Sequence, residues 1–98
     1  MSEIAESFKR DLAAVNWREL RIHLQRDAII VVAEGLDLVT VGVAVAEDNK
    51  GLVEGWIAAH QLGKPNEPQL QSWEQEPDRR FKMLIVQPFI LIQDDNNG

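Results

Sequence analysis

A chain of 98 residues, of which 45% are hydrophobic and 27% charged, has the composition of an ordinary globular protein and the length of one domain. The absence of cysteine excludes disulfides, thiolate zinc sites, iron–sulfur clusters and cysteine nucleophiles. A net charge of −6 without a basic stripe argues against nucleic-acid binding, because that function needs clustered Lys and Arg to neutralise phosphates.

The start of the chain and its apolar runs indicate where the protein resides. Its first residues carry acidic side chains instead of the basic and apolar regions of a secretory signal. The longest apolar stretches, residues 28–33 and 38–46, are far shorter than the ~20 residues of a membrane-spanning helix. We therefore expect a cytoplasmic protein with no membrane partner, folded as a single domain over residues 1–98 with residues 1–3 and 94–98 disordered.

Two helices are expected before the first strand. Between Ile4 and Val15 the large apolar residues recur every three or four positions, as in an amphipathic helix with one buried stripe. Asn16, with a glutamate three residues later, resembles a capping box. A second helix is therefore predicted to begin at Trp17.

Two β-branched runs are expected to form a hairpin. Residues 28–33 are too few for a buried helix and rich in Ile and Val, so they predict a strand. Residues 34–37, Glu-Gly-Leu-Asp, have the composition of a tight connection. In residues 38–46 valine alternates with smaller residues, which predicts a second strand with one bulky and one small face. Gly42 and Ala44 on the small face would let another element or another subunit approach the backbone closely.

Two more helices are predicted in the second half of the chain. The apolar stripe from Leu52 to Ile57 indicates a helix capped by Asp48 or Asn49. A shorter helix is expected to open at Asn66-Glu67-Pro68, where asparagine provides a cap and proline fits the first turn.

The last predicted element is a strand over residues 81–93 that contains Pro88. Because proline cannot donate a ladder hydrogen bond, this strand lies at a sheet edge or bends at the proline. The predicted order is helix, helix, strand, strand, helix, helix, strand. The expected fold class is α+β, with about three mainly antiparallel strands, a β-hairpin plus a C-terminal strand, covered by about four helices.

Glu47, Asp48 and Asn49 lie where the predicted second strand ends and the next helix begins. Ligand sites of sheet proteins often occupy such junctions, and free backbone N–H groups at a helix start can hold an anion. The side chains are themselves acidic or amide and disfavour a phosphate, so a helix cap with flanking charge is the favoured interpretation. As a ligand site, the junction would be walled by Trp56 or Trp73.

The histidines and tryptophans provide no metal or catalytic site. His23 and His60 have no metal-ligand spacing, so surface positions explain them, and no metal or other cofactor is expected. Trp17, Trp56 and Trp73 lie on helical stripes where core packing is favoured, with Trp73 the best candidate for binding because its surroundings are polar. No Ser-His-Asp arrangement or glycine-rich phosphate loop nominates a catalytic residue.

Four segments within residues 10–93 together resemble a known family. They are Trp17-Arg18-Glu19-Leu20, then Leu36-Asp37-Leu38-Val39, then Ala46-Glu47-Asp48-Asn49-Lys50 with Leu52-Val53 and Trp56, and Gln87-Pro88-Phe89-Ile90-Leu91-Ile92-Gln93. The family consists of small bacterial proteins catalogued as a domain of unknown function. The resemblance implies a bacterial, cytoplasmic protein with a compact fold and carries over no active site.

Two functional hypotheses follow. The first is a non-enzymatic interaction or regulatory module that binds another protein or, as a dimer, a second copy of itself. The contact would use Gly42 and Ala44, or the C-terminal strand at Phe89 and Leu91, because a small chain covers both faces of an apolar sheet only sparingly. The alternative is a small-molecule binding or catalytic domain with its site near Glu47–Asn49.

Overall fold

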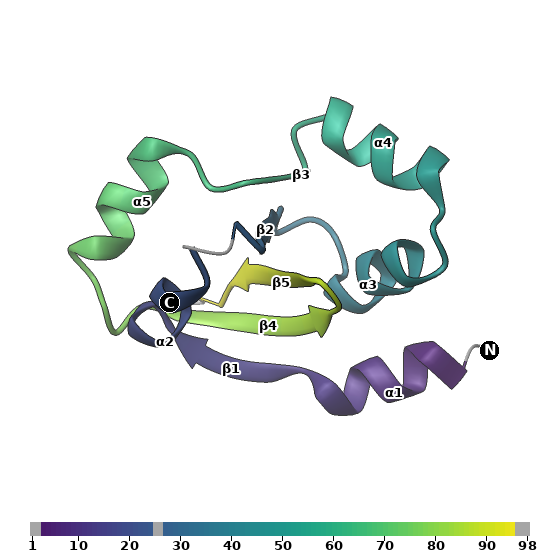
Figure 1. Ribbon diagram of the computed structural model, residues 1–98, viewed down its shortest axis with the longest axis horizontal. Coiled ribbons are helices and arrows are strands. Elements are labelled where there is room, and N and C mark those ends of the chain that lie inside the picture. The colour runs from purple at the N-terminus through teal and green to yellow at the C-terminus, as the bar shows by residue number, and fades with distance from the viewer. Residues whose placement is uncertain (1–2, 25–26, 96–98) are drawn as a thin grey trace.

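The computed structural model describes residues 3–24 and 27–95. The elements follow in the order α1 (Glu3–Asp11), β1 (Ala13–Asn16), α2 (Trp17–Leu24), β2 (Ile29–Val32), α3 (Leu38–Ala46), α4 (Lys50–Ala58), β3 (Leu62–Gly63), α5 (Glu67–Glu74), β4 (Arg80–Val86) and β5 (Phe89–Asp94) (Figure 1). The α+β class is confirmed, with five helices and five strands in the described ranges instead of four and three. Of the termini predicted to be disordered, residues 1–2 and 96–98 lie outside these ranges, Glu3 begins α1 and Asp94 ends β5.

The strands form one mixed sheet in the order β1-β4-β5-β2-β3. The neighbours pair antiparallel except β2 and β5, which run parallel with Ile30 opposite Leu91. The sheet is therefore mixed. The expected antiparallel pairing is present in three of the four neighbouring pairs and absent from the central pair of β2 and β5. A parallel pair needs a long crossover connection, and no local turn signal marks it in the sequence.

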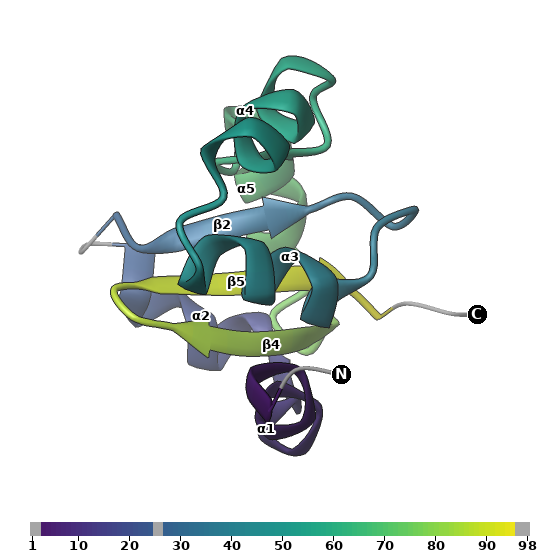
Figure 2. The same cartoon turned by 90° about the vertical axis from the view of Figure 1, so that its right-hand side faces the viewer.

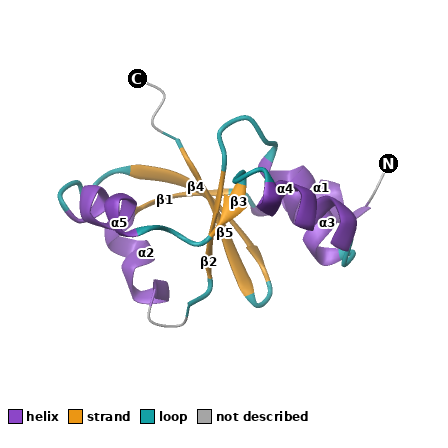
Figure 3. Ribbon diagram, turned by 90° about the horizontal axis from the view of Figure 1, so that it is seen from above, coloured by secondary structure: helices purple, strands orange, loops and turns teal. Residues whose placement is uncertain are grey.

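Helices cover both faces of the sheet. Figure 3 shows α2 and α5 on one side of the strands and α1, α3 and α4 on the other, and Figure 2 shows α3 lying across β5. Because successive strand residues point to opposite faces, β5 sends Ile90 and Ile92 to the first side and Leu91 to the second. A strand covered on both sides is apolar at successive positions, as β5 is from Phe89 to Ile92.

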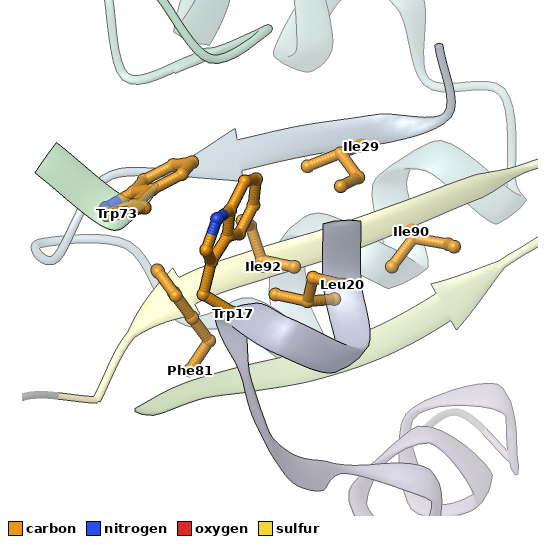
Figure 4. Packing of buried hydrophobic residues seen from close by; sticks show 7 residues of the cluster. All are labelled: Trp17, Leu20, Ile29, Trp73, Phe81, Ile90 and Ile92. Atoms are coloured by element: carbon orange, nitrogen blue, oxygen red, sulfur yellow. The ribbon is translucent and has the colours of Figure 1, made fainter. Parts of the chain in front are cut away.

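Two hydrophobic clusters result, one on each face. The aromatic cluster, under α2 and α5, consists of Trp17, Leu20, Ile29, Trp73, Phe81, Ile90 and Ile92 (Figure 4). The aliphatic cluster, under α1, α3 and α4, consists of Val32, Leu38, Val41, Leu62, Leu84, Val86 and Leu91. In the aromatic cluster the ring centroids of Trp17 and Trp73 are 5.0 Å apart, as are those of Trp73 and Phe81.

The predicted second strand, residues 38–46, is wrong: these residues form the helix α3. Asp37 caps this helix by accepting hydrogen bonds from the backbone N–H of Thr40 at 3.0 Å and from its hydroxyl. Five of the nine residues of α3 are buried. A helix enclosed in this way is apolar around most of its circumference, so its sequence shows no helical stripe and its valines imitate a strand.

The predicted helix over residues 4–15 is too long. It ends at Asp11, and β1 continues the chain along the edge of the sheet beside β4. Phe8 packs against the aliphatic cluster and Val15 against the aromatic cluster, so the two residues do not share one stripe. The chain therefore passes from one face of the sheet to the other between Phe8 and Val15, where β1 forms the edge of the sheet.

The single C-terminal strand predicted for residues 81–93 is two strands. Pro88 lies in the turn between β4 and β5, after a cis peptide bond from Gln87, so the proline interrupts no ladder. The two strands pair antiparallel from Phe81 with Asp94 to Val86 with Phe89. The expected bend at the proline is therefore a complete reversal, which places β5 at the sheet centre instead of at an edge.

Gly42 gives a direct test of how tightly α3 packs. An added Cβ at this position would lie 2.6 Å from Cδ2 of Leu84, which is fully buried, and 3.2 Å from Cδ2 of Phe8. We expect Gly42→Val to lower the free energy of unfolding by about 1–3 kcal/mol through overpacking. At Gly55 in α4 nothing lies within 4 Å of an added Cβ, so Gly55→Val should change stability by less than about 0.5 kcal/mol. Urea denaturation of both variants measures the difference, and equal losses would contradict this packing.

Candidate functional site

The Glu47–Asn49 segment is a short connection between two helices. The chain leaves α3 through Glu47, Asp48 takes a left-handed backbone conformation with φ 56°, and Asn49 caps α4 by accepting the N–H of Leu52 at 3.3 Å. The backbone N–H groups of all three residues donate to carbonyls of α3 at 2.8–3.1 Å. These donors are therefore occupied. The expected strand end is instead the end of the helix α3, and Asn49 forms the helix cap that the sequence favoured at this junction.

Beside this connection lies an open groove of about 500 Å³ between α4 and the sheet. We call it the α4 groove. Its apolar lining includes Ile30 of β2, Leu62 of β3, Phe89 and Leu91 of β5, and Val53 and Ile57 of α4. Asp48, Asn49, Lys50 and Glu54 add polar groups. The sheet side continues the aliphatic cluster, to which Leu62 and Leu91 belong.

The groove brings together residues that the sequence suggested for different purposes. Asp48 and Asn49 were candidates for a ligand site, and Phe89 and Leu91 for an interface, and all four line the same groove. Glu47 lies outside it and lines a separate hollow beside α1.

The other predicted site residues lie elsewhere. Trp56 packs against the aliphatic cluster, and Trp73 lies in the aromatic cluster on the opposite face of the sheet. Gly42 and Ala44 are buried within the chain. The small size of Gly42 serves the approach of α3 to β4 and α1, because an added Cβ there would meet Leu84 and Phe8.

One face of α4 forms the helical wall of the groove. Lys50, Val53, Glu54 and Ile57, which line it, follow one another at helical spacing. No residue of α4 is buried, and Ile57 is 52% exposed. The Val53 and Ile57 stripe was readable in the sequence as a buried helix face, but nothing in the sequence showed that Ile57 stays exposed while Val53 packs against the aliphatic cluster.

The charged groups of the groove are exposed. Asp48, Lys50 and Glu54 form no side-chain ion pair with any residue in the described ranges. Elsewhere on the surface such pairs are present, for example between Arg18 and Asp78 at 3.3 Å. The groove therefore combines an apolar interior with charges that are available to an incoming group.

A second hollow, of about 430 Å³, lies between α5 and the sheet on the aromatic side. Trp73 lines it together with Arg79, whose guanidinium pairs with Asp94 and, at 3.2 Å, with Glu76. The hydrogen bond that Arg79 donates to the carboxylate of Asp94 raises the pKa of Arg79 against the opposing effect of burial, so the guanidinium stays charged. Its Nε is buried, with no hydrogen-bond partner among the residues that the structure describes. The ion pairs join the end of β5 to the approach to β4, which gives Arg79 a structural role.

No group of three or more His, Asp or Glu side chains within residues 3–24 and 27–95 is arranged to hold a metal ion. His60 is exposed after the end of α4, with a left-handed φ of 60°. Among the helices that the structure describes, none is long and apolar enough to cross a membrane.

The comparisons with known proteins agree with the fold and leave the groove without an assigned role. A family model described as "Protein of unknown function (DUF2288)" matches residues 3–94, which is nearly the whole chain. The chain belongs to the DUF2288 family. The predicted membership of an uncharacterised bacterial family is confirmed.

A solved structure similar to this DUF2288 chain is the solution NMR structure of PA1075 from Pseudomonas aeruginosa. The two sequences are 26% identical, the TM-score is 0.81, and the match covers 99% of this chain and 90% of that one. No curated protein matches the chain. The arrangement of a five-stranded sheet between two helical layers is therefore shared with a bacterial protein.

Proposed function

We propose that this member of the DUF2288 family is a non-enzymatic interaction module whose binding surface is the α4 groove. The observation that carries the proposal is the position of α4: its apolar face borders an open groove and none of its residues is buried. An amphipathic helix normally packs its apolar face against the sheet that it covers. In α4, Val53 and Trp56 pack against the aliphatic cluster, but Ile57 keeps 52% of its surface exposed, and Phe89 of β5, which lines the same groove, keeps 38%.

The composition of the groove favours binding over chemistry. Its walls are aliphatic and aromatic, and its charged groups, Asp48, Lys50 and Glu54, are exposed. Water screens exposed charges strongly, so these groups are poorly placed to stabilise a developing charge in a reaction. They are well placed to orient an apolar partner that carries polar groups at its edge.

Exposed apolar surface in a folded domain marks interaction sites when the side chains are adjacent. Ile57 and Phe89 approach the same groove from α4 and from the start of β5. Scattered exposed apolar residues, such as Ile22 on α2, need no such explanation.

A small-molecule site remains the second candidate, because a volume of about 500 Å³ lies within the range of ligand pockets. In that case Asp48 and Asn49 would contact the polar part of the ligand. A thermal-shift screen of metabolites tests this candidate, since a ligand that binds only the folded state raises the melting temperature.

We predict that Ile57→Glu weakens the binding of a neutral apolar dye, Nile red, several-fold, because a carboxylate in the groove wall disfavours an apolar occupant. Leu52→Glu is the matched control: Leu52 belongs to the same helix, is 48% exposed and does not line the groove. Fluorescence titration measures both affinities. Equal dye binding by the two variants would refute the α4 groove as the binding surface.

A further inference from the structure

We propose that the occupant of the α4 groove is a second copy of this chain, bound in a two-fold symmetric dimer. The exposed apolar side chains at the groove of each copy would fill the groove of the other. This inference rests on the proposed function and names the partner of the same surface.

A two-fold interface requires one patch to provide both a projecting group and the hollow that receives it. The α4 groove meets this requirement. Ile57 and Phe89 line it and remain exposed, whereas Leu62 and Leu91 in the same lining are buried. The exposed pair forms the projecting part and the buried pair the floor, so two copies are complementary without any further element.

The charges of α4 are also self-complementary. Lys50 and Glu54 lie one helical turn apart on the face that lines the groove. Neither makes an ion pair within the described part of the chain. When two copies of α4 meet antiparallel about a two-fold axis, Lys50 of each lies within reach of Glu54 of the other. Both intermolecular contacts then join opposite charges.

The net charge of the chain opposes its association with a second copy. Two chains of −6 each repel one another, so association at a random surface is disfavoured. In the proposed dimer, two symmetric contacts between Lys50 and Glu54 offset part of this repulsion at the interface. A domain of this size also buries a modest share of its surface, and dimerisation would cover apolar surface at Ile57 that folding leaves exposed.

Sedimentation equilibrium at high micromolar concentration tests the dimer directly. The wild-type chain is expected to have twice its mass of 11.1 kDa. Ile57→Glu should be monomeric, and Leu52→Glu should associate like the wild type because Leu52 lies outside the groove. A dimer that survives Ile57→Glu would overturn the proposal.

A charge exchange between two variants tests the contact without touching the apolar surface. Lys50→Glu alone and Glu54→Lys alone each place like charges opposite one another and should weaken the homodimer several-fold. Mixing the two variants should restore association as a mixed dimer, which native mass spectrometry resolves by mass. A mixture that forms no excess of the mixed dimer over the homodimers would overturn the Lys50 and Glu54 contact.

The same samples separate failure of this inference from failure of the proposed function. If the wild-type chain is monomeric but binds Nile red in a way that Ile57→Glu abolishes, the second copy is excluded and the groove is still a binding site. If it is monomeric and Ile57→Glu binds the dye like Leu52→Glu, both ideas fail.

Discussion

Replacing Trp17 by alanine is expected to lower the free energy of unfolding by about 3–5 kcal/mol. Trp17 is fully buried at the first turn of α2 and contacts both other aromatic rings of its cluster, with Trp73 at 5.0 Å and Phe81 at 6.5 Å between centroids. Its indole Nε1 donates a hydrogen bond to Glu74 at 3.1 Å. The substitution therefore removes an aromatic contact and a hydrogen bond that join α2 to α5 across one face of the sheet.

This loss is large relative to the total stability of the protein. A chain of this length has a total stability of about 5–15 kcal/mol, so the variant loses a large fraction of it. Urea denaturation followed by circular dichroism measures the change. Ile22→Ala is the matched control on the same helix, because Ile22 is 68% exposed, and it should cost less than about 0.5 kcal/mol. Similar losses in both variants would contradict the aromatic cluster as the centre of this face.

Gln93→Leu is expected to cost about 1–3 kcal/mol, because it removes two buried hydrogen bonds and takes from the carbonyl of Leu36 the donor that Gln93 provides, whereas the carbonyl of Ala33 keeps the N–H of Leu36 at 3.1 Å. Gln93 is 6% exposed, and its Nε2 donates to the carbonyl of Ala33 at 2.7 Å and to that of Leu36 at 2.6 Å. These bonds tie the loop between β2 and α3 to the end of β5. Leucine has a similar size, so the loss reports hydrogen bonding more than packing.

The same substitution should also disturb the α4 groove. The loop held by Gln93 leads into α3, and α3 leads through the Glu47–Asn49 connection into α4. Nile red binding by Gln93→Leu is therefore expected to weaken, whereas Gln87→Leu, at the exposed turn between β4 and β5, should leave stability unchanged. Chemical denaturation and dye titration check both statements. Unaltered stability of Gln93→Leu would show that the two bonds contribute nothing net.

Helix starts were the most predictable features of this chain. Asn16, Asn49 and Asn66 each accept a hydrogen bond from the backbone N–H three residues later, as their spacing indicates. At α5 the full capping box is present, with Gln69 bonding back to Asn66. A cap involves residues within one turn of each other, so the sequence contains nearly all the information that determines it.

The helix α3 and the strand β1 could not be assigned in this way. Val39, Val41, Val43 and Val45 follow the two-residue period of a strand, yet the capping bond of Asp37 and the enclosure of α3 by the sheet and α1 make the segment helical. Tertiary contacts override the weak helix propensity of valine. Similarly, Val15 lies in a strand because β4 offers a partner along its edge.

The sequence by itself determined the α+β class, the capped starts of α2, α4 and α5, and the family. It also supplied four residues of the candidate site, Asp48, Asn49, Phe89 and Leu91, as separate suggestions. Only the tertiary structure decided that these four line one groove, that β2 and β5 pair in parallel, and that Ile57 of α4 stays exposed at the groove. Capping depends on residues that are neighbours in the chain. The groove depends on α4 and β5, which lie some forty residues apart in the sequence and are brought together by the packing of the whole sheet.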